Sequence, residues 1–145
     1  MAEPRPLRIL LVEDEPVNRA LLRAVLGTAR VLGPVELTEA ATLAAGRTAL
    51  AEVDPDIVIL DVRLPDGNGL DLARDFASDQ QRPKFLVMSA SVLPRDREIA
   101  RAAGTDRFLG KPFLPRDLIA MLEELTREVT PTGGRAGGAG TDRPA

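Results

Sequence analysis

The residues Ile57-Val58-Ile59-Leu60-Asp61 are the clearest indication of the fold class of this chain. Its four apolar residues come directly after the turn sequence Asp54-Pro55-Asp56. A short apolar run bounded by turn residues is typical of a strand buried on both faces of a parallel sheet. In open parallel sheets, ligands bind beyond the carboxyl ends of the strands. We therefore expect Asp61 to lie at a sheet edge where a ligand binds.

Four other apolar runs are predicted as strands, and a segment with helical spacing follows each of the five runs. The predicted strands are residues 7–12, 35–38, 57–60, 85–88 and 107–109. The predicted helices are residues 16–29, 43–53, 70–77, 95–103 and 115–129. This alternation predicts an α/β fold with a doubly wound, five-stranded parallel sheet in the order 2-1-3-4-5, covered by helices on both faces.

Polar residues stand at or just beyond the ends of the predicted strands. They are Glu13 and Asp14 after the first, Asp61 after the third, Ser89 after the fourth and Lys111 after the fifth. Two carboxylates about 4 Å apart repel each other by roughly 4 kcal/mol at an effective dielectric constant of about 20, so the acids need a cation to hold them together. Oxygen ligands of this kind suit Mg²⁺. A phosphoryl group would then fit between the metal, the lysine and the hydroxyl, with a carboxylate as the attacking oxygen.

Each of these residues also has a purely structural interpretation. Asp14 could cap the first helix, and Ser89 could be a turn residue. Asp61 could also belong to a turn, although the following loop already contains other turn-forming residues. Lys111 could be a surface lysine, but Lys occurs only here and at position 84 among the 19 basic residues. That scarcity favours a role that needs a compact ammonium group and not a guanidinium.

The composition limits the chemistry. The chain has no Cys and no His, which excludes thiol nucleophiles, disulfides, Cys/His zinc sites and His general bases from these residues. The formal net charge is −3 over 145 residues. That charge offers no basic field for a nucleic-acid backbone, so we expect no direct binding to DNA or RNA.

The length suits one domain with a single core. We expect this domain at residues 7–129, between a disordered N-terminus at 1–6 and a disordered Gly/Pro-rich tail at 130–145. Residues 1–6 contain no apolar stretch that would serve as a signal peptide or membrane span. The sequence therefore predicts a cytoplasmic protein that does not contact membranes.

Four segments together closely resemble the receiver domain of two-component response regulators, in its single-domain form similar to the chemotaxis regulators. They are ILLVEDEP at 9–16, IVILDVRLPDG at 57–67, VMSA at 87–90 and FLGKPF at 108–113. The resemblance covers residues 7–129 and implies the flavodoxin-like (βα)5 fold.

The resemblance implies that Asp61 is the phosphoacceptor. It also implies that Glu13 and Asp14 bind Mg²⁺ together with Asp61 and the backbone carbonyl of Arg63, and that Lys111 binds the phosphoryl group. Since the chain has no His, the phosphohistidine donor must lie on another protein. The expected donor is a sensor histidine kinase or a histidine phosphotransfer protein.

The resemblance further implies that Ser89 is the switch hydroxyl and Phe108 the switch aromatic. On phosphorylation, Ser89 would move toward the new oxygens and Phe108 would fill the space that it leaves. This change would repack the face formed by the fourth helix, fifth strand and last helix, where an unknown downstream protein would bind. A phosphorylation-dependent homodimer is a further expected partner state.

The favoured function is a stand-alone receiver that switches partner binding, or that relays or sinks phosphate. Such a protein is a signalling switch with self-phosphorylation and slow autodephosphorylation, and not an enzyme. One alternative is a Mg²⁺-dependent phosphatase with an Asp nucleophile, but that class would want an acid where this chain has Arg63. Another is a degenerate receiver that acts as a phosphorylation-independent scaffold. A nucleotide-binding sheet is least favoured, because no glycine-rich loop follows the first strand.

Overall fold

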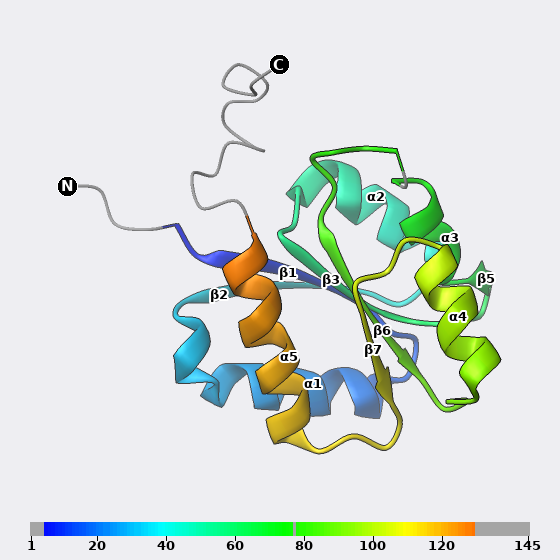
Figure 1. Cartoon of the computed structure of the whole chain (residues 1–145). Helices are drawn as coiled ribbons and strands as arrows, with labels where there is room; N and C mark the ends of the chain where they lie inside the picture. The colour runs from blue at the N-terminus through cyan, green and yellow to red at the C-terminus, as the bar shows by residue number, and fades with distance from the viewer. Residues whose placement is uncertain (1–4, 77, 130–145) are drawn as a thin grey trace.

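A five-stranded parallel sheet forms the centre of the computed structural model, which describes residues 5–76 and 78–129 (Figure 1). The sheet order is β2-β1-β3-β6-β7. The bounds are Leu7–Val12 for β1, Val35–Ala40 for β2, Ile57–Asp61 for β3, Lys84–Ser89 for β6 and Arg107–Gly110 for β7. Counted along the chain, these strands have the predicted order 2-1-3-4-5, which is confirmed.

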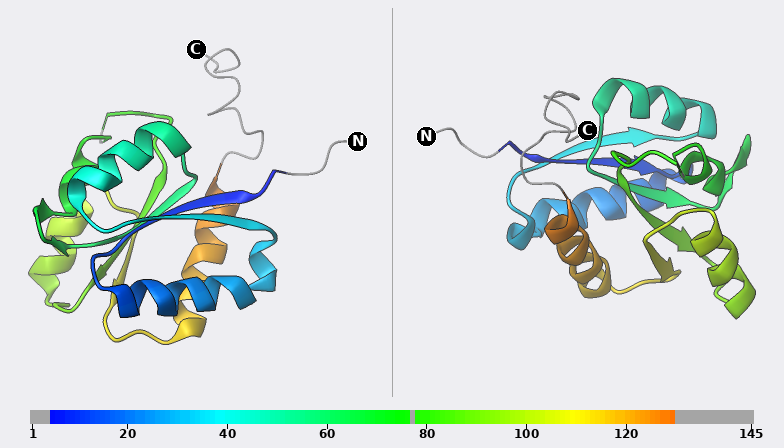
Figure 2. Two further views of the ribbon diagram at one scale, coloured as in Figure 1. Left: turned by 180° about the vertical axis from the view of Figure 1, so that it is seen from behind. Right: turned by 45° about the horizontal axis from the view of Figure 1, so that its top comes forward.

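Helices cover both faces of this sheet (Figure 2). Their bounds are Pro16–Thr28 for α1, Leu43–Val53 for α2, Leu70–Arg74 for α3, Pro94–Ala102 for α4 and Pro115–Glu128 for α5. A short 3-10 helix, η1, spans Arg30–Leu32. Helices α1 and α5 pack on one face, while α2, α3 and α4 lie on the other. Among the described residues, no helix combines the length and the apolar character needed to cross a bilayer.

The two helical layers explain the uninterrupted apolar run of β3. Ile57 and Ile59 pack in the cluster under α1 and α5, whereas Val58 and Leu60 pack in the cluster under the other helices. All four residues have no exposed surface. Because both faces of the strand are covered, neither face has a place for polar residues.

Three elements differ in length from their prediction by two or more residues, and one of them, β6, is a residue longer at each end. Strand β2 extends to Ala40 because all six of its residues pair with β1. It is an edge strand with one neighbour, so charged residues such as Glu39 are tolerated. Because these residues are not apolar, a search for apolar runs does not find the end of the strand. Helix α3 ends at Arg74, and Phe76 turns back so that its ring centroid lies 6.1 Å from that of Phe85. Residue 77, the predicted end of this helix, lies outside the described residues.

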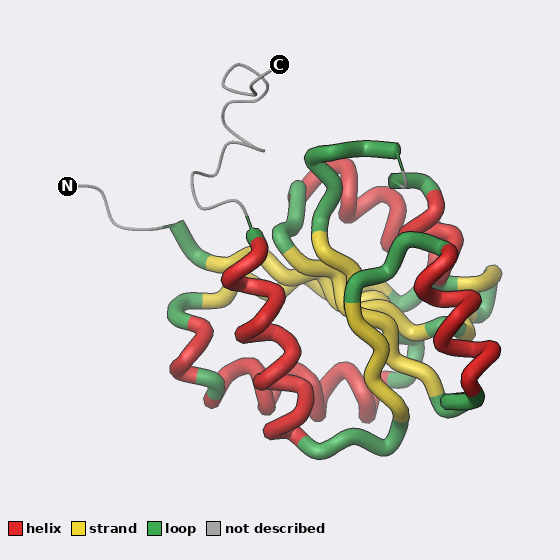
Figure 3. The backbone as a smooth tube through the Cα atoms, viewed as in Figure 1, coloured by secondary structure: helices red, strands yellow, loops and turns green. Residues whose placement is uncertain are grey.

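A small hairpin, β4 (Arg63–Leu64) and β5 (Gly67–Asn68), follows β3 and was not predicted (Figure 3). Its turn carries Asp66, whose carboxylate accepts hydrogen bonds from the backbone N–H groups of Leu43 (2.7 Å) and Ala44 (3.0 Å). Those groups begin α2, so Asp66 caps a helix that is 22 residues away in the chain. The hairpin is thereby fixed beside the carboxyl edge of the sheet.

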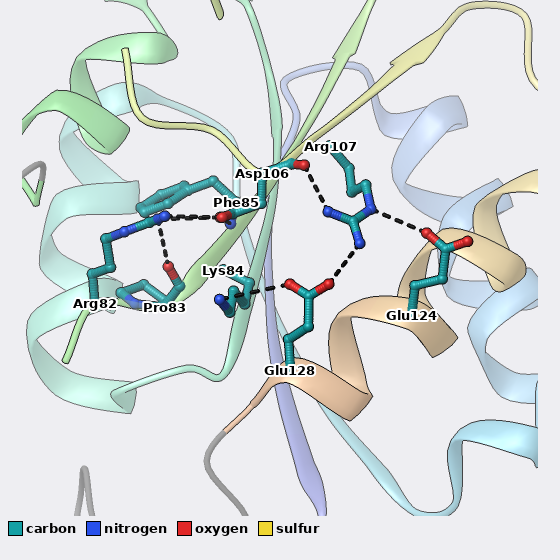
Figure 4. Close-up of polar contacts among 8 residues, drawn as sticks. All are labelled: Arg82, Pro83, Lys84, Phe85, Asp106, Arg107, Glu124 and Glu128. Carbon is teal, nitrogen blue, oxygen red and sulfur yellow. Dashed lines mark hydrogen bonds and ion pairs between the residues drawn. The ribbon is translucent and has the colours of Figure 1, made fainter. Parts of the chain in front are cut away.

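Ion pairs connect the elements at the opposite edge of the sheet, that is, at the amino ends of the strands, where β6 and β7 begin (Figure 4). Asp106 accepts hydrogen bonds from Arg82 at 2.9 and 3.1 Å and from the backbone N–H of Phe85 at 2.8 Å. Next to it, Arg107 pairs with two α5 carboxylates at 3.1 and 2.7 Å. The acids are Glu124 and Glu128. These contacts connect β6, β7 and α5 at the edge away from Asp61.

The predicted disordered ends, 1–6 and 130–145, fall outside the described residues except for Arg5 and Pro6. The guanidinium of Arg5 donates hydrogen bonds of 2.7 and 3.2 Å to the buried carboxylate of Asp56. The domain limits at 7 and 129 therefore stay a proposal.

Candidate functional site

Three carboxylates meet at the carboxyl edge of the sheet. Glu13 and Asp14 follow β1, and Asp61 ends the neighbouring strand β3. One oxygen from each carboxylate lies within 4.8 Å of the others. Glu13 and Asp61 are buried, and Asp14 is half-buried. The structure thus brings together the acids that the strand order places at this edge.

Backbone hydrogen bonds fix Glu13 in this position. Its N–H donates to the carbonyl of Ala40 at 2.9 Å, which continues the pairing of β1 with β2. Its carboxylate accepts a hydrogen bond of 3.1 Å from the backbone N–H of Glu15. The capping interpretation of Asp14 does not hold, because Glu15 is the N-cap residue of α1 and that cap has no side-chain hydrogen bond.

Lys111 joins this cluster from the loop after β7. Its ammonium donates hydrogen bonds to Asp61 Oδ2 at 2.9 Å and to Glu13 Oε1 at 3.3 Å. Burial alone would lower the pKa of Lys111. The hydrogen bond and charge of Asp61, followed by those of Glu13, outweigh burial and raise the pKa above its usual value. The amine therefore stays charged throughout the neutral range.

The charges of the cluster match a divalent cation. Three carboxylates and one ammonium leave two net negative charges, and the acids of such a group repel one another without a counterion. The donors are oxygens, as Mg²⁺ prefers. Arg63 begins β4 two residues after Asp61, at an exposed position. That its backbone carbonyl is a further ligand of the metal stays a prediction.

Ser89 ends β6 with its hydroxyl turned into local hydrogen bonds. It donates to the carbonyl of Ser91 at 3.0 Å and accepts from the N–H of Ser91 at 3.1 Å. The hydroxyl of Ser91 donates to Asp96 at 2.5 Å, and Asp96 also accepts from the N–H of Leu93 at 3.1 Å. Asp96 is not among the predicted site residues, although an acid in the first turn of a helix after Pro94 is a capping signal.

Phe108 lies on β7, half-buried against the apolar cluster under α2, α3 and α4. The guanidinium carbon of Arg97, on α4, lies 4.8 Å from the centre of its ring. This distance is that of a cation–π contact. The side chain that the resemblance marks as the switch aromatic is thus covered by a charged residue that is not among the predicted site residues.

Gly69 packs directly against the backbone of Asp61. A Cβ at this position would overlap the carbonyl oxygen of Asp61, and the N–H of Gly69 donates to the carbonyl of Val62 at 2.7 Å. Only glycine fits this close approach. A glycine immediately before a predicted helix was the available sequence signal.

A pocket of about 630 Å³ opens above this edge of the sheet. Its lining includes Asp61, Ser89 and Lys111, together with exposed arginines from β4 and α4. The nucleophile candidate, the hydroxyl and the ammonium therefore share one accessible space. A phosphorylated ligand that enters this space meets all three groups.

Comparisons with known sequences identify relatives of this chain. The family model described as response regulator receiver domain matches residues 9–123. The chain is 37% identical over 131 residues to the transcriptional regulatory protein GltR of Pseudomonas aeruginosa, covering 89% of this chain and 52% of that protein. The chain spans about half the length of the curated relatives that it matches.

Solved structures show the same fold. The receiver domain of the Pseudomonas aeruginosa sensor histidine kinase PA1611, with a magnesium ion coordinated in its active site cleft, is 27% identical with a TM-score of 0.73 and covers 85% of this chain and 99% of its own. A CheY-like receiver domain protein of Methanospirillum hungatei is 25% identical with a TM-score of 0.72, covering 86% and 96%. This chain therefore belongs to the receiver domain family of two-component response regulators, whose members are signalling switches.

Proposed function

We propose that this receiver accepts a phosphoryl group onto Asp61 from the phosphohistidine of a sensor histidine kinase or histidine phosphotransfer protein. The observation that supports this proposal best is the placement of Asp61. Its carboxylate ends a buried strand, pairs with the ammonium of Lys111 at 2.9 Å and lies within 4.8 Å of two further acids. A nucleophile held in this way faces the accessible pocket.

In the transfer step, an oxygen of Asp61 forms a bond to phosphorus while the nitrogen–phosphorus bond of the phosphohistidine breaks. The electron pair stays on the imidazole nitrogen, and Asp61 becomes an acyl phosphate. Lys111 then pairs with the phosphoryl oxygens, where negative charge accumulates in the transition state. When bound by Glu13, Asp14, Asp61 and the Arg63 carbonyl, Mg²⁺ would neutralise charge on the same oxygens.

The switch that follows uses Ser89 and Phe108. Ser89 gives up its hydrogen bonds with Ser91, which are 3.0 and 3.1 Å long in this structure, and bonds the phosphoryl group. The loop before α4 then moves, and Phe108 turns into the space beneath it. We propose that this change alters the surface of α4, β7 and α5, to which a downstream protein or a second copy of the chain binds.

The apolar residues of this surface support its role in partner binding. Val92 and Leu93, before α4, and Ile99, within it, are each more than two-fifths exposed, at 44%, 52% and 48%. All three lie between Ser89 and the end of α4. A movement of the loop before α4 therefore changes which apolar side chains a partner meets.

The decisive test is phosphorylation of the purified chain. With a phosphorylated histidine kinase or acetyl phosphate, and with Mg²⁺ present, mass spectrometry should find one added phosphoryl group. The group should be absent in Asp61→Asn and after chelation of the metal. An unchanged mass of the wild type would refute the phosphoacceptor proposal and favour the scaffold alternative, and sustained hydrolysis of an unrelated phosphomonoester would favour the phosphatase. Onward transfer from Asp61 to a second histidine protein would identify a relay.

We further propose that the receiver acts as a stand-alone protein in the cytoplasm. Immunoblotting of fractionated cells tests this point. A soluble band at the 15.5 kDa of this chain supports it. A band of about twice that mass, the length of the curated relatives, would instead place the receiver within a longer protein.

A further inference from the structure

Two arginines at the pocket above Asp61 have no acidic partner. Within residues 5–76 and 78–129, the side chains of Arg63 and Arg95 make no ion pair and no hydrogen bond. Most of the other described arginines do, for example Arg82 with Asp106 at 2.9 Å and Arg23 with Glu39 at 2.7 Å. Two guanidinium groups without partners in one pocket are thus free to bind an anion.

Their position relative to the nucleophile is specific. Asp61 is 8% exposed and forms the floor of the pocket, whereas Arg63 and Arg95 are exposed and form its rim. The two acids of the metal cluster, Glu13 and Asp14, do not line this pocket. The pocket side of Asp61 therefore carries the two arginines and one acid, Asp96. The carboxylate of Asp96 accepts hydrogen bonds from the Ser91 hydroxyl at 2.5 Å and from the N–H of Leu93 at 3.1 Å, and it pairs with neither arginine.

The order of atoms in phosphoryl transfer explains what such a rim would do. The attacking and leaving atoms lie roughly in line on opposite sides of phosphorus. A phosphoryl group seated on Asp61 therefore directs its leaving group outward, toward the rim. The pocket of about 630 Å³ has room for a leaving group as well as a phosphoryl group.

We propose that Arg63 and Arg95 bind the carboxylate leaving group of acyl phosphates, and so make acyl phosphates the preferred class of small-molecule phosphodonor. The inference rests on the proposed phosphorylation of Asp61. In this step an Asp61 oxygen bonds to phosphorus, the bond from phosphorus to the acyl oxygen breaks, and the electron pair leaves with a carboxylate. Guanidinium groups bind carboxylates through two parallel hydrogen bonds, which strengthen as the negative charge develops.

A donor with a nitrogen–phosphorus bond has a leaving group that the rim arginines do not stabilise. When phosphoramidate reacts, the electron pair stays on nitrogen, a proton is added and neutral ammonia leaves. The rim arginines have no anion to stabilise on that leaving group. The two donors deliver the same phosphoryl group to Asp61, so the ratio of their rates isolates recognition of the leaving group.

The experiment compares both donors on the purified full chain with Mg²⁺. The readout is the ratio of the rate constant with acetyl phosphate to that with phosphoramidate. Arg63→Gln and Arg95→Gln should each lower this ratio about 10-fold. Arg30→Gln is the matched control, since Arg30 lies in η1, does not line the pocket, and should leave the ratio unchanged. Thermal unfolding of each variant verifies its fold.

Failure of the leaving-group role can be distinguished from failure of Asp61 phosphorylation. If the wild type is phosphorylated by both donors but the two rim variants slow both equally, the leaving-group role is overturned and Asp61 phosphorylation stands. If neither donor phosphorylates the wild type, the proposed function fails together with the inference.

Discussion

The ammonium of Lys111 lies 2.9 Å from Oδ2 of Asp61, although the two residues are 50 positions apart in the chain. Asp61 ends β3, and Lys111 follows β7, with β6 between these strands in the sheet. The N–H of Lys111 donates to the carbonyl of Ser89 at the end of β6, at 2.8 Å. The lysine loop is therefore tied to the middle strand, and its side chain reaches across that strand to the nucleophile.

Asp61→Asn is expected to raise the free energy of unfolding by about 1 kcal/mol without divalent cations. It removes one of three mutually repelling carboxylates, and the Asn oxygen still accepts from Lys111. The same variant should lose most of the stabilisation that Mg²⁺ gives the wild type. Urea unfolding with and without Mg²⁺ measures both effects. The exposed Asp75→Asn is the control, and an Mg²⁺ response equal to that of the wild type would refute the assignment of Asp61 as a metal ligand.

Gly69→Ala should destabilise the protein by about 2 kcal/mol and slow phosphorylation of Asp61. The added methyl group overlaps the carbonyl oxygen of Asp61, so the end of β3 must shift. Gly27→Ala is the matched control, because a Cβ at that helical position meets nothing within 4 Å. That change should stabilise α1 slightly. Denaturant unfolding and phosphorylation rates test the pair, and wild-type behaviour of Gly69→Ala would contradict the close approach.

Arg97 and Phe108 should show a coupling energy of about 0.5 to 1 kcal/mol. A double-mutant cycle of Arg97→Gln and Phe108→Leu, followed by urea unfolding, measures this coupling. Arg101 lies on the same helix but pairs with Glu98 at 2.7 Å. A parallel cycle of Arg101→Gln with Phe108→Leu should give no coupling, and equal values in both cycles would exclude a specific contact with the ring.

Asp106→Ala should cost about 2 to 3 kcal/mol of stability, since it leaves Arg82 and the backbone N–H of Phe85 without their acceptor. Asp106→Asn should cost less, because its amide oxygen still accepts from that N–H. The exposed pair of Glu98 and Arg101 gives the comparison, and Glu98→Ala should cost at most about 0.5 kcal/mol. Chemical unfolding ranks the three variants, and a similar small cost for all would argue against the network at this edge.

The cap that Asp66 forms on α2 should weaken in acid. Hydrogen bonds from the backbone N–H groups of Leu43 and Ala44 hold the pKa of Asp66 below its usual value. Because the folded state has the lower pKa, the stabilisation is present above the unfolded value of about 3.9 and is lost as pH falls through the folded one.

The urea midpoint of the wild type should therefore exceed that of Asp66→Asn at pH 7, and the gap should narrow on acidification. Thr42→Ala removes the other cap of the same helix, an uncharged acceptor 3.0 Å from the N–H of Ala45. Its effect should stay constant with pH. A gap for Asp66→Asn that is equally constant would show that the charge of Asp66 does not contribute.

The residue pattern alone predicts the layer architecture and the edge of the sheet on which the site lies. A strand buried on both faces, such as Ile57 to Leu60, needs apolar residues at every position, and this requirement is visible in a one-dimensional pattern. A polar residue directly after such a strand must emerge at its carboxyl end. For that reason Glu13, Asp61 and Ser89 could be predicted to share an edge before their contacts were known.

The loops and side chains that complete the site depend on contacts between segments that are distant in the chain. The cap from Asp66 to α2, the close approach of Gly69 and the contact of Arg97 with Phe108 join residues from separate elements. The free rim arginines became visible only when the partners of the others were known. Loop paths and side-chain directions depend on packing between distant segments, and this packing leaves no periodic signal in the sequence.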